Sequence, residues 1–489
     1  MLGKVKHAKK GETMQDNQHA GNPRTQGLGN TTRRAFIGAG ATAFLFGGRC
    51  LFGADAATAH RPKPSGRVNL AVIGCGTMGR GDMLAFMKDP RVRIAAVCDP
   101  VGELRDYGYS PRRRSWGGRL AFKRLADAHY KDNACRAVVD FREIVDDPSI
   151  DAVCITTPDH WHALIAIACM KKGKHVYCQK PMSFGVSEGI AMVRAAKEHG
   201  VTFQVGSQQR NASEFRIAAE WIRNGYLGEC MECEVGLPGG RGPYWGYPGD
   251  RTPRKAPGYF TPDGTWDMWQ GPAEHHEGNV FIPVIHGPMC WRSNSRTGGG
   301  MITDWGAHHI DILHWALGVE RSGPVAVENF KSDGFGADPL LDWAGEYSFD
   351  FVYANGFRAH VSNRYTNGLR FKGKKGDLFV ARGRLDRPDF LKKWDEGRDL
   401  GANEVHLYKA AAGHNHELDF IDGIFENRPI ATDCEIGHRS ISACHIANIC
   451  ERLGLSTLKW DPSAERFTGA NADAANALLE VKHHNGWKL

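Results

Sequence analysis

The chain has 489 residues, of which 42% are hydrophobic, 24% charged and 10% aromatic. This length exceeds the roughly 250–300 residues that one core usually serves, so we expect at least two cores, and the composition excludes a disordered or collagen-like protein. The net charge is +7, but the first 59 residues hold eight Lys or Arg against three Asp or Glu. The remainder is therefore close to neutral, and nothing in it favours a nucleic-acid-binding protein.

The N-terminal segment is typical of a targeting signal. Thr32-Arg33-Arg34-Ala35-Phe36-Ile37 precedes a small and apolar run over residues 38–48, and further small residues follow at 54–59. This order resembles a twin-arginine (Tat) export signal. The apolar run is shorter than the ~20 residues that a permanent membrane span requires. We therefore predict that residues 1–59 are a signal peptide and leader, and that the Tat translocase exports the protein to the periplasm.

A dinucleotide-binding fingerprint follows the signal. The β-favouring run at residues 67–73 leads into Gly74-Cys75-Gly76-Thr77-Met78-Gly79, which opens a helical stretch. Glycines at this spacing allow a tight turn and a close approach of the backbone to a pyrophosphate. Asp99 ends the next predicted strand, where a carboxylate can bind both ribose hydroxyls of NAD and repel the extra phosphate of NADP. NADP is less favoured, but it stays an alternative, because Arg105 lies nearby in the sequence and its charge could neutralise the extra phosphate.

Predicted strands and helices alternate after Asp99. We expect strands at residues 137–139, 152–155, 175–178 and 202–205, with helices between them. This alternation predicts a doubly wound parallel sheet, in which ligands bind beyond the carboxyl ends of the strands. Two loops lie at those ends, namely Thr156-Thr157-Pro158-Asp159-His160-Trp161-His162 and Gln179-Lys180-Pro181.

The order of these motifs resembles the Gfo/Idh/MocA family (glucose-fructose oxidoreductase, inositol dehydrogenase and MocA), and specifically its exported bacterial branch. The GxGxxG turn and Asp99 precede Thr157-Pro158 with His162, then Lys180-Pro181, then Gly298-Gly299-Gly300 ahead of Asp304, Gly306, His308 and Asp311. The resemblance covers nearly the whole chain after the signal. One departure is Gln179, because the family usually has a glutamate before the lysine.

The resemblance implies an α/β protein with an N-terminal NAD-binding Rossmann domain over residues 66–210. A substrate-binding α/β domain over residues 211–489 would carry a large, open, mostly antiparallel sheet that often forms an oligomer interface. The alternating segments 346–353 and 357–363 flank Asn355-Gly356, which predicts a β-hairpin. The aromatic-rich segment from Gly236 to Pro288 either lines a carbohydrate site or forms a structural lid.

Oxidation of a secondary alcohol needs a base for the hydroxyl proton and a donor that stabilises the developing alkoxide. Lys180 and His308 can provide both. Asp304 lies four residues before His308 on a helix predicted over residues 301–317, so the two side chains face the same way. We therefore predict Lys180, His308 and Asp304 as catalytic residues, which also bind substrate together with Arg210, Trp291 and Arg292. The predicted cofactor contacts are Gly74, Gly76, Thr77, Met78, Gly79, Asp99, Thr157, Pro158, His162 and Lys180.

We expect no metal site. His309 and His314 lie near His308, but His309 is about 100° further round the helix. Cys230 and Cys233 would point to opposite faces of a strand and supply only half a zinc site. The 13 cysteines are an odd number without framework spacing, so we expect no disulfide scaffold.

Three functions are compatible with these residues. The leading hypothesis is an exported NAD-dependent oxidoreductase that acts on a secondary hydroxyl of a sugar, polyol or glycoside and holds NAD tightly. The alternative is a redox-neutral NAD-dependent glycosidase, which oxidises, eliminates, hydrates and reduces with the same residues. A non-catalytic sugar-binding protein is disfavoured by the intact Lys180, Asp304 and His308. We further expect a homo-oligomer formed through the C-terminal sheet.

Overall fold

The computed structural model describes residues 66–105, 116–240, 250–260, 265–275, 280–287, 290–389, 400–401 and 403–489. The predicted signal, residues 1–59, lies outside this part of the chain. Among the described residues, none of the helices combines the length and apolarity that crossing a membrane requires.

Six parallel strands form the first sheet, in the order β3-β2-β1-β4-β5-β6. Their Val, Ile, Ala and Cys residues are mostly buried, as expected for parallel strands covered on both faces. The strand order reverses between β1 and β4, which places a ligand-binding switch point at their carboxyl ends. The strands are β1 Val68–Ile73, β2 Val92–Cys98, β3 Arg136–Val138, β4 Ala152–Ile155, β5 His175–Cys178 and β6 Phe203–Val205. The predicted doubly wound sheet is confirmed.

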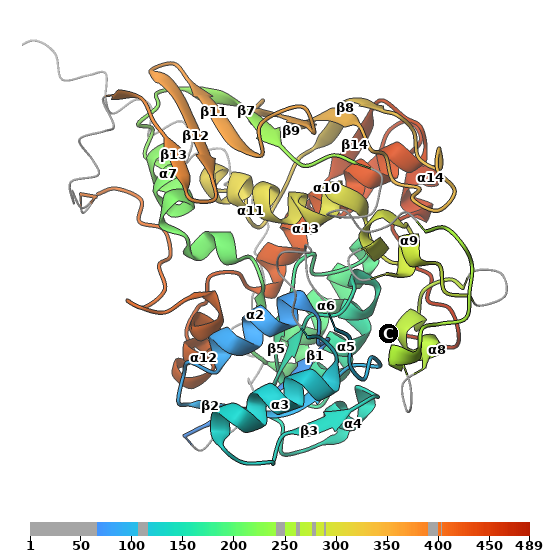
Figure 1. The fold of residues 1–489 in the computed structure, drawn as a ribbon. Helices are drawn as coiled ribbons and strands as arrows, with labels where there is room; N and C mark the ends of the chain where they lie inside the picture. Colours follow the sequence, from blue (N-terminus) through green and yellow to red (C-terminus); the bar gives the residue numbers. More distant parts are fainter. Residues whose placement is uncertain are drawn as a thin grey trace, which may run out of the picture. The chain divides into compact units, whose positions relative to one another are not determined.

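Helices cover both faces of this sheet. On one face lie α4 (Arg142–Asp146), α5 (His162–Lys171) and α6 (Val186–His199). On the other lie α2 (Thr77–Phe86), α3 (Arg119–Tyr130) and α12 (His416–Glu426). Figure 1 shows α12 beside α2, and the rings of Phe86 and Phe420 lie 6.2 Å apart. A helix from the last 80 residues thus completes the core of the N-terminal sheet.

Nine strands form the second sheet, in the order β13-β12-β11-β7-β10-β9-β8-β14-β15. The β7–β10 pair is parallel, and the other pairs are antiparallel. The predicted hairpin is confirmed as β9 and β10, with Gly356 at a φ of +83°. The strands are β7 Cys230–Gly236, β8 Ala326–Ser332, β9 Tyr347–Val352, β10 Arg358–Ser362, β11 Gly368–Gly373, β12 Gly376–Ala381, β13 Arg384–Asp386, β14 Leu458–Asp461 and β15 Arg466–Thr468.

The two faces of the second sheet differ. One packs against α7 (Ser213–Arg223), α11 (Gly306–Leu317) and α13 (Cys434–Arg452). The other carries ion pairs between neighbouring strands, such as Lys372 with Glu234 at 2.7 Å. The shorter helices are α8 Trp266–Gln270, α9 Pro283–His286, α10 Gly300–Asp304 and α14 Ala472–Ala477, with 3₁₀ turns η1 Asp159–Trp161, η2 Gln208–Asn211, η4 Gly258–Phe260 and η6 Cys290–Ser293.

Candidate active site

The turn between β1 and α2 leaves room for a ligand against its backbone. Gly74 has a φ of +101°, and a Cβ on it would lie 2.6 Å from the carbonyl carbon of Thr156. A Cβ on Gly79 would lie 2.3 Å from the carbonyl oxygen of Gly74. Only glycine fits at these positions without a shift of the backbone, and the N-terminus of α2 faces the same space. This local geometry fits a dinucleotide pyrophosphate.

Asp99 lies at the carboxyl end of β2, beside this turn. Its Oδ2 accepts a hydrogen bond from the backbone N–H of Cys75 at 2.6 Å, and its Oδ1 accepts from Val101 at 2.8 Å. Burial raises the pKa of Asp99 to about 6, while these two hydrogen bonds and the charge of Arg119 limit the rise. The carboxyl group is therefore mostly ionised at neutral pH, as ribose recognition by a carboxylate requires. Arg105, in contrast, stacks on Trp116 and is exposed.

A buried histidine joins the two loops that follow β4 and β5. The ring of His162 lies between two carbonyl oxygens, 2.7 Å from Pro181 O and 2.9 Å from Thr157 O. Burial lowers the pKa of His162 to about 4, so its ring is neutral. Thr157 and Pro158 line the large cavity between the two sheets, whereas His162 is not among its lining residues. His162 thus acts on the site through the loops that it holds together.

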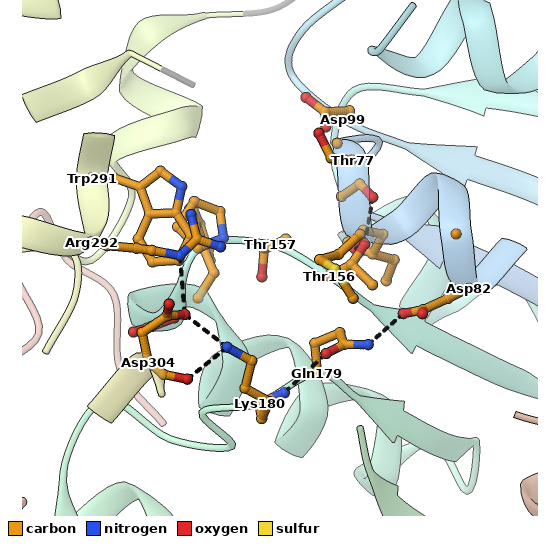
Figure 2. Close-up of a pocket in the computed structure, with 18 of the residues that line it drawn as sticks. Thr77, Asp82, Asp99, Thr156, Thr157, Gln179, Lys180, Trp291, Arg292 and Asp304 are labelled. Carbon is orange, nitrogen blue, oxygen red and sulfur yellow. Dashed lines mark hydrogen bonds and ion pairs between the residues drawn. The ribbon is translucent and has the colours of Figure 1, made fainter. Parts of the chain in front are cut away.

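Lys180, Asp304 and Arg292 form a cluster where the two halves of the molecule meet (Figure 2). The Nζ of Lys180 donates to Asp304 Oδ1 at 2.8 Å and to the backbone oxygen of Asp304 at 2.7 Å. The Nε of Arg292 donates to the same Oδ1 at 3.1 Å. One buried carboxylate therefore orients two cations from different segments.

This cluster also explains why the predicted helix over residues 301–317 is divided into α10 and α11. In a continuous α-helix the carbonyl of Asp304 would accept from the N–H of His308. Lys180 donates to that carbonyl instead, and the N–H of His308 donates to Trp305 O at 3.0 Å, one residue closer. The helix therefore tightens at Trp305, where the lysine reaches its backbone.

The charged groups in the cluster shift one another's pKa values. Burial alone would raise the pKa of Asp304, but the charges of Lys180 and Arg292 outweigh burial and hold its pKa well below the ordinary value. Burial lowers the pKa of Lys180, while the negative charge of Asp304 limits the fall. Asp304 is therefore ionised, and its charge favours the ammonium form of Lys180.

His308 lies four residues after Asp304, at the start of α11. Burial, followed by the charges of Lys180 and Arg382, lowers the pKa of His308 well below its ordinary value. Its ring is 6% exposed, and its Nδ1 has no hydrogen-bond partner among the described residues. His308 is thus a neutral imidazole with a free ring nitrogen beside a lysine.

One cavity of about 910 Å³ connects these features. Its walls include Gly74, Gly76, Thr77, Met78 and Asp99 at one end, and Lys180, Trp291, Arg292, Asp304 and His308 at the other. Aromatic residues from the segment predicted to be a site wall or a lid also line it, namely Tyr259, Phe260 and Trp269. Most of the predicted cofactor and substrate contacts therefore share a single space.

Gly79, predicted as a cofactor contact, and Arg210, predicted as a substrate contact, are not among the residues that line this cavity. Arg210 does not line this cavity, because its guanidinium is buried against Asp311, with Nε 2.7 Å from Oδ2. His309 contacts Asn367 and His314 contacts Tyr353, both away from the cavity. The described cysteines, Cys230 and Cys233 included, are free thiols. Within the described residues, no three His, Cys, Asp or Glu side chains are grouped to hold a metal ion.

Several lining residues were not among the site residues predicted from the sequence, and Asp82, Glu417, Arg382 and Asp159 are ionisable members of that group. Asp82 follows the glycine turn on α2, and the Nε2 of Gln179 donates to its Oδ2 at 2.7 Å (Figure 2). Glu417 comes from α12, and burial together with Glu417 raises the pKa of Asp82 well above its ordinary value. Gln179 donates a hydrogen bond to Asp82, whereas a glutamate at this position would place a third carboxyl group beside those of Asp82 and Glu417. Arg382 lies over Trp305, and Asp159 is buried beside Arg292.

A six-stranded Rossmann sheet that shares a cavity with a second sheet-bearing half is an arrangement found in NAD-binding oxidoreductases. Two family models match this chain: the NAD-binding Rossmann fold of an oxidoreductase family over residues 68–207, and the C-terminal α/β domain of the same family over residues 220–489. The chain belongs to the Gfo/Idh/MocA oxidoreductase family, and its first sheet is the NAD-binding domain.

Similar proteins act on sugars and polyols. The chain is 34% identical over 325 residues to the NAD-dependent scyllo-inositol 2-dehydrogenase of Bacillus subtilis, covering 64% of this chain and 74% of that protein. It is 30% identical over 164 residues to levoglucosan dehydrogenase of Pseudarthrobacter phenanthrenivorans, and 26% identical over 169 residues to 2,7-anhydro-N-acetylneuraminate hydratase of Escherichia coli. Each of these two matches covers 34% of this chain and spans only 39% of the relative.

A solved structure has the same fold. Levoglucosan dehydrogenase in complex with NADH and levoglucosan superposes with a TM-score of 0.55 at 19% identity, over 80% of this chain and 99% of that chain.

Proposed function

We propose that this protein oxidises a secondary hydroxyl of a sugar, polyol or glycoside with tightly held NAD. The observation that carries the proposal is the single cavity, which has the glycine turn and Asp99 at one end and Lys180, Asp304 and His308 at the other. The dehydrogenases among the relatives support this substrate class.

Each protein group has its own part in this reaction. NAD, when bound, accepts the hydride. Two N–H bonds of the Lys180 ammonium are directed to Asp304, and the third can donate to the substrate oxygen as negative charge develops on it. The neutral His308 can take the hydroxyl proton on its free Nδ1. Asp304 orients Lys180, and Arg292 shares the charge of Asp304.

A second candidate function is the redox-neutral glycosidase cycle. The observation in its favour is the similarity to a protein named 2,7-anhydro-N-acetylneuraminate hydratase. The two candidates share the oxidation step and differ in the later steps, because only the glycosidase eliminates the aglycone and returns the hydride.

The test is to purify the protein, release and identify any bound nucleotide, and then supply inositols, levoglucosan and aryl glycosides. The oxidoreductase yields NADH and a ketone, and the glycosidase releases an aglycone without net NADH. Failure of every polyol and glycoside to reduce NAD, even transiently, would reject both.

We also propose that the protein is exported through the Tat translocase to the periplasm, on the basis of the Arg33-Arg34 segment. Replacing both arginines by lysine should leave the precursor in the cytoplasm, and normal export of that variant would contradict the proposal.

We further propose a homo-oligomer formed through the C-terminal sheet. The ion-paired outer face of that sheet would make the interface polar. Light scattering at low and high salt measures the oligomeric state, and a monomer at low salt would contradict the proposal.

A further inference from the structure

Asp159 is a buried carboxyl group in the cavity to which the proposed oxidation gives no role. It opens the 3₁₀ turn η1 after β4, is 2% exposed, and lines the same cavity as Lys180, Arg292 and Asp304. The backbone N–H of Gly299 donates to the Asp159 carboxyl group, but Oδ1 of Asp159 has no hydrogen-bond partner among the described residues. A buried polar atom without a partner is unfavourable unless a ligand satisfies it.

The charged groups around Asp159 come from three segments. Lys180 follows β5, Arg292 lies in η6 and Asp304 ends α10. Lys180 and Arg292 both hydrogen-bond to Asp304, whose single negative charge offsets one of their two positive charges. The Cys178 thiol on β5 is also close, and burial raises its pKa well above the ordinary value, with a further contribution from Asp159.

Burial of Asp159 favours its neutral carboxylic acid form and outweighs the opposing charges of Arg292 and Lys180. Burial raises the pKa of Asp159 to about 8; the charge of Arg292 opposes the rise and that of Asp304 adds to it. Asp304 is ionised, so the cavity holds two acids in opposite protonation states. Paired groups of this kind are a recurrent arrangement where one must accept a proton and the other must donate one.

We propose that Asp159 is a general acid of this cavity, which donates its Oδ1 proton to an oxygen atom that leaves the substrate. The inference rests on the proposed function, because the leaving oxygen must lie β to a ring carbon that has been oxidised to a ketone. Hydride transfer alone requires a base and a hydrogen-bond donor, and His308 and Lys180 already supply them.

Elimination requires one proton more. A base removes the hydrogen next to the ketone, a carbon–carbon double bond forms, and the bond to the leaving oxygen breaks as that oxygen takes the proton of Asp159. When water adds to the double bond, the Asp159 carboxylate takes one proton from the water, the remaining hydroxyl bonds to the carbon that lost the leaving oxygen, and the protonated base returns the proton that it had removed to the carbon next to the ketone. No further oxidant or reductant is consumed.

The experiment compares phenyl and 4-nitrophenyl glycosides of the same sugars with the NAD-loaded parent and Asp159→Asn. The 4-nitrophenolate ion leaves without protonation more readily than phenolate does. Asp159→Asn should therefore lower phenol release by about 10²-fold or more, the lower end of what a general acid contributes, and lower 4-nitrophenol release far less. Equal losses on both glycosides would overturn the proposal.

The matched control is His160→Gln. His160 follows Asp159 in the same buried turn, contacts Thr297 O and Trp269 O, and does not line the cavity. Damage to the turn should lower the release of both leaving groups by the same factor. A preference for 4-nitrophenyl glycosides in His160→Gln as strong as in Asp159→Asn would overturn the assignment to Asp159.

Two further readouts separate this inference from the proposed function. Reduction of NAD by a glycoside without release of any aglycone would reject Asp159 as a general acid but would still support the oxidoreductase. If the parent protein neither reduces NAD nor releases an aglycone, both the proposed function and the role of Asp159 are rejected. Infrared titration of the substrate-free protein should show protonated carboxyl absorption that persists above pH 7, and Asp159→Asn should remove one component of it, while the Asp82 carboxyl group, whose pKa is also raised, still absorbs. A band unchanged by that substitution would overturn the proposal.

Discussion

The two ends of the cavity are built in different ways. At the cofactor end, Gly74, Gly76, Thr77 and Met78 of one turn, with Asp99 at the end of the next strand, present mainly backbone atoms and one carboxylate. At the substrate end, Lys180 meets Arg292, Asp304 and His308, which lie more than a hundred residues later in the chain, and charged side chains hold the cluster together. The first end depends on a local turn, whereas the second depends on how the loops after β5 pack against η6, α10 and α11. Substitutions at the substrate end should therefore change turnover, whereas substitutions at the cofactor end should change NAD binding or the free energy of unfolding.

The largest expected effect is at the substrate end. His308→Ala removes the neutral base, which typically contributes 10²- to 10⁴-fold, so the chemical barrier should rise by about 3–5 kcal/mol. NAD retention should stay near that of the parent, because the cofactor turn is untouched. The measurements are turnover of any accepted polyol or glycoside and the amount of nucleotide that copurifies.

His309→Ala is the matched control, because its ring is one helical position away and contacts Asn367 outside the cavity. It should change turnover little if the fold is intact. Equal losses in both variants would indicate a structural helix, and a larger loss in His309→Ala would mean that the other face of α11 carries the chemistry.

The next effect is at the cofactor end. Asp99→Ala removes the carboxylate that can bind two ribose hydroxyls, so NAD binding should weaken by about 2–4 kcal/mol. Calorimetric titration with NAD measures this change. Glu103→Ala serves as the control, since Glu103 pairs with Arg124 and is not part of the cavity wall. An Asp99→Ala protein that binds NAD as tightly as the parent would show that ribose recognition lies elsewhere.

Asp159 should give the substrate end a pH-dependent stability. Its pKa of about 8 in the folded protein exceeds the value near 3.9 of an unfolded aspartate, so its contribution is present below about pH 4 and is lost as the pH rises towards 8. Relative to Asp159→Asn, the parent should lose about 1.4 kcal/mol of unfolding free energy per pH unit between roughly pH 5 and 7. Urea denaturation at several pH values checks this, and parallel curves would show that Asp159 ionises normally.

The smallest effect tests the cofactor turn itself. Gly74→Ala places a side chain on a left-handed backbone and against the Thr156 carbonyl, so unfolding free energy should fall by about 1–3 kcal/mol. Gly81→Ala is the control on α2, where a Cβ meets nothing within 4 Å. Because alanine favours a helix over glycine by about 1 kcal/mol, this variant should be more stable than the parent in a thermal melt. A similar loss in both variants would mean that helix α2, rather than the turn, is the sensitive element.

The same contrast explains what could be predicted from the sequence. The glycine turn, Asp99 and the parallel strands follow from short local patterns, and in the structure the turn and Asp99 directly follow two neighbouring strands of that sheet. Lys180, Asp304 and His308 were found only because their order along the chain matched a family. Local sequence patterns also predict one continuous helix over residues 301–317, because they contain no information about the hydrogen bond from Lys180 to the Asp304 carbonyl.

The remaining differences depend on tertiary contacts. Arg210 was expected at the substrate, but Asp311, seven residues after Asp304, is the partner that buries it. Glu417 reaches the cavity from α12, and nothing near it in the sequence indicates a nucleotide site. Asp159 lies in the loop that the sequence places at the end of β4, but its burial depends on the tertiary structure, and its protonation depends on that burial and on the neighbouring charges.

Helix α12 has a consequence for the order in which the chain assembles. The N-terminal sheet is synthesised by about residue 205, but Phe420, Ile421 and Ile424 cover part of one face and arrive more than two hundred residues later. Until then, that part of the face stays uncovered, and the cavity lacks Glu417. A nascent chain cut short before α12 would therefore expose an apolar surface that chaperones and proteases recognise, and the site would be complete only after nearly the whole polypeptide had left the ribosome.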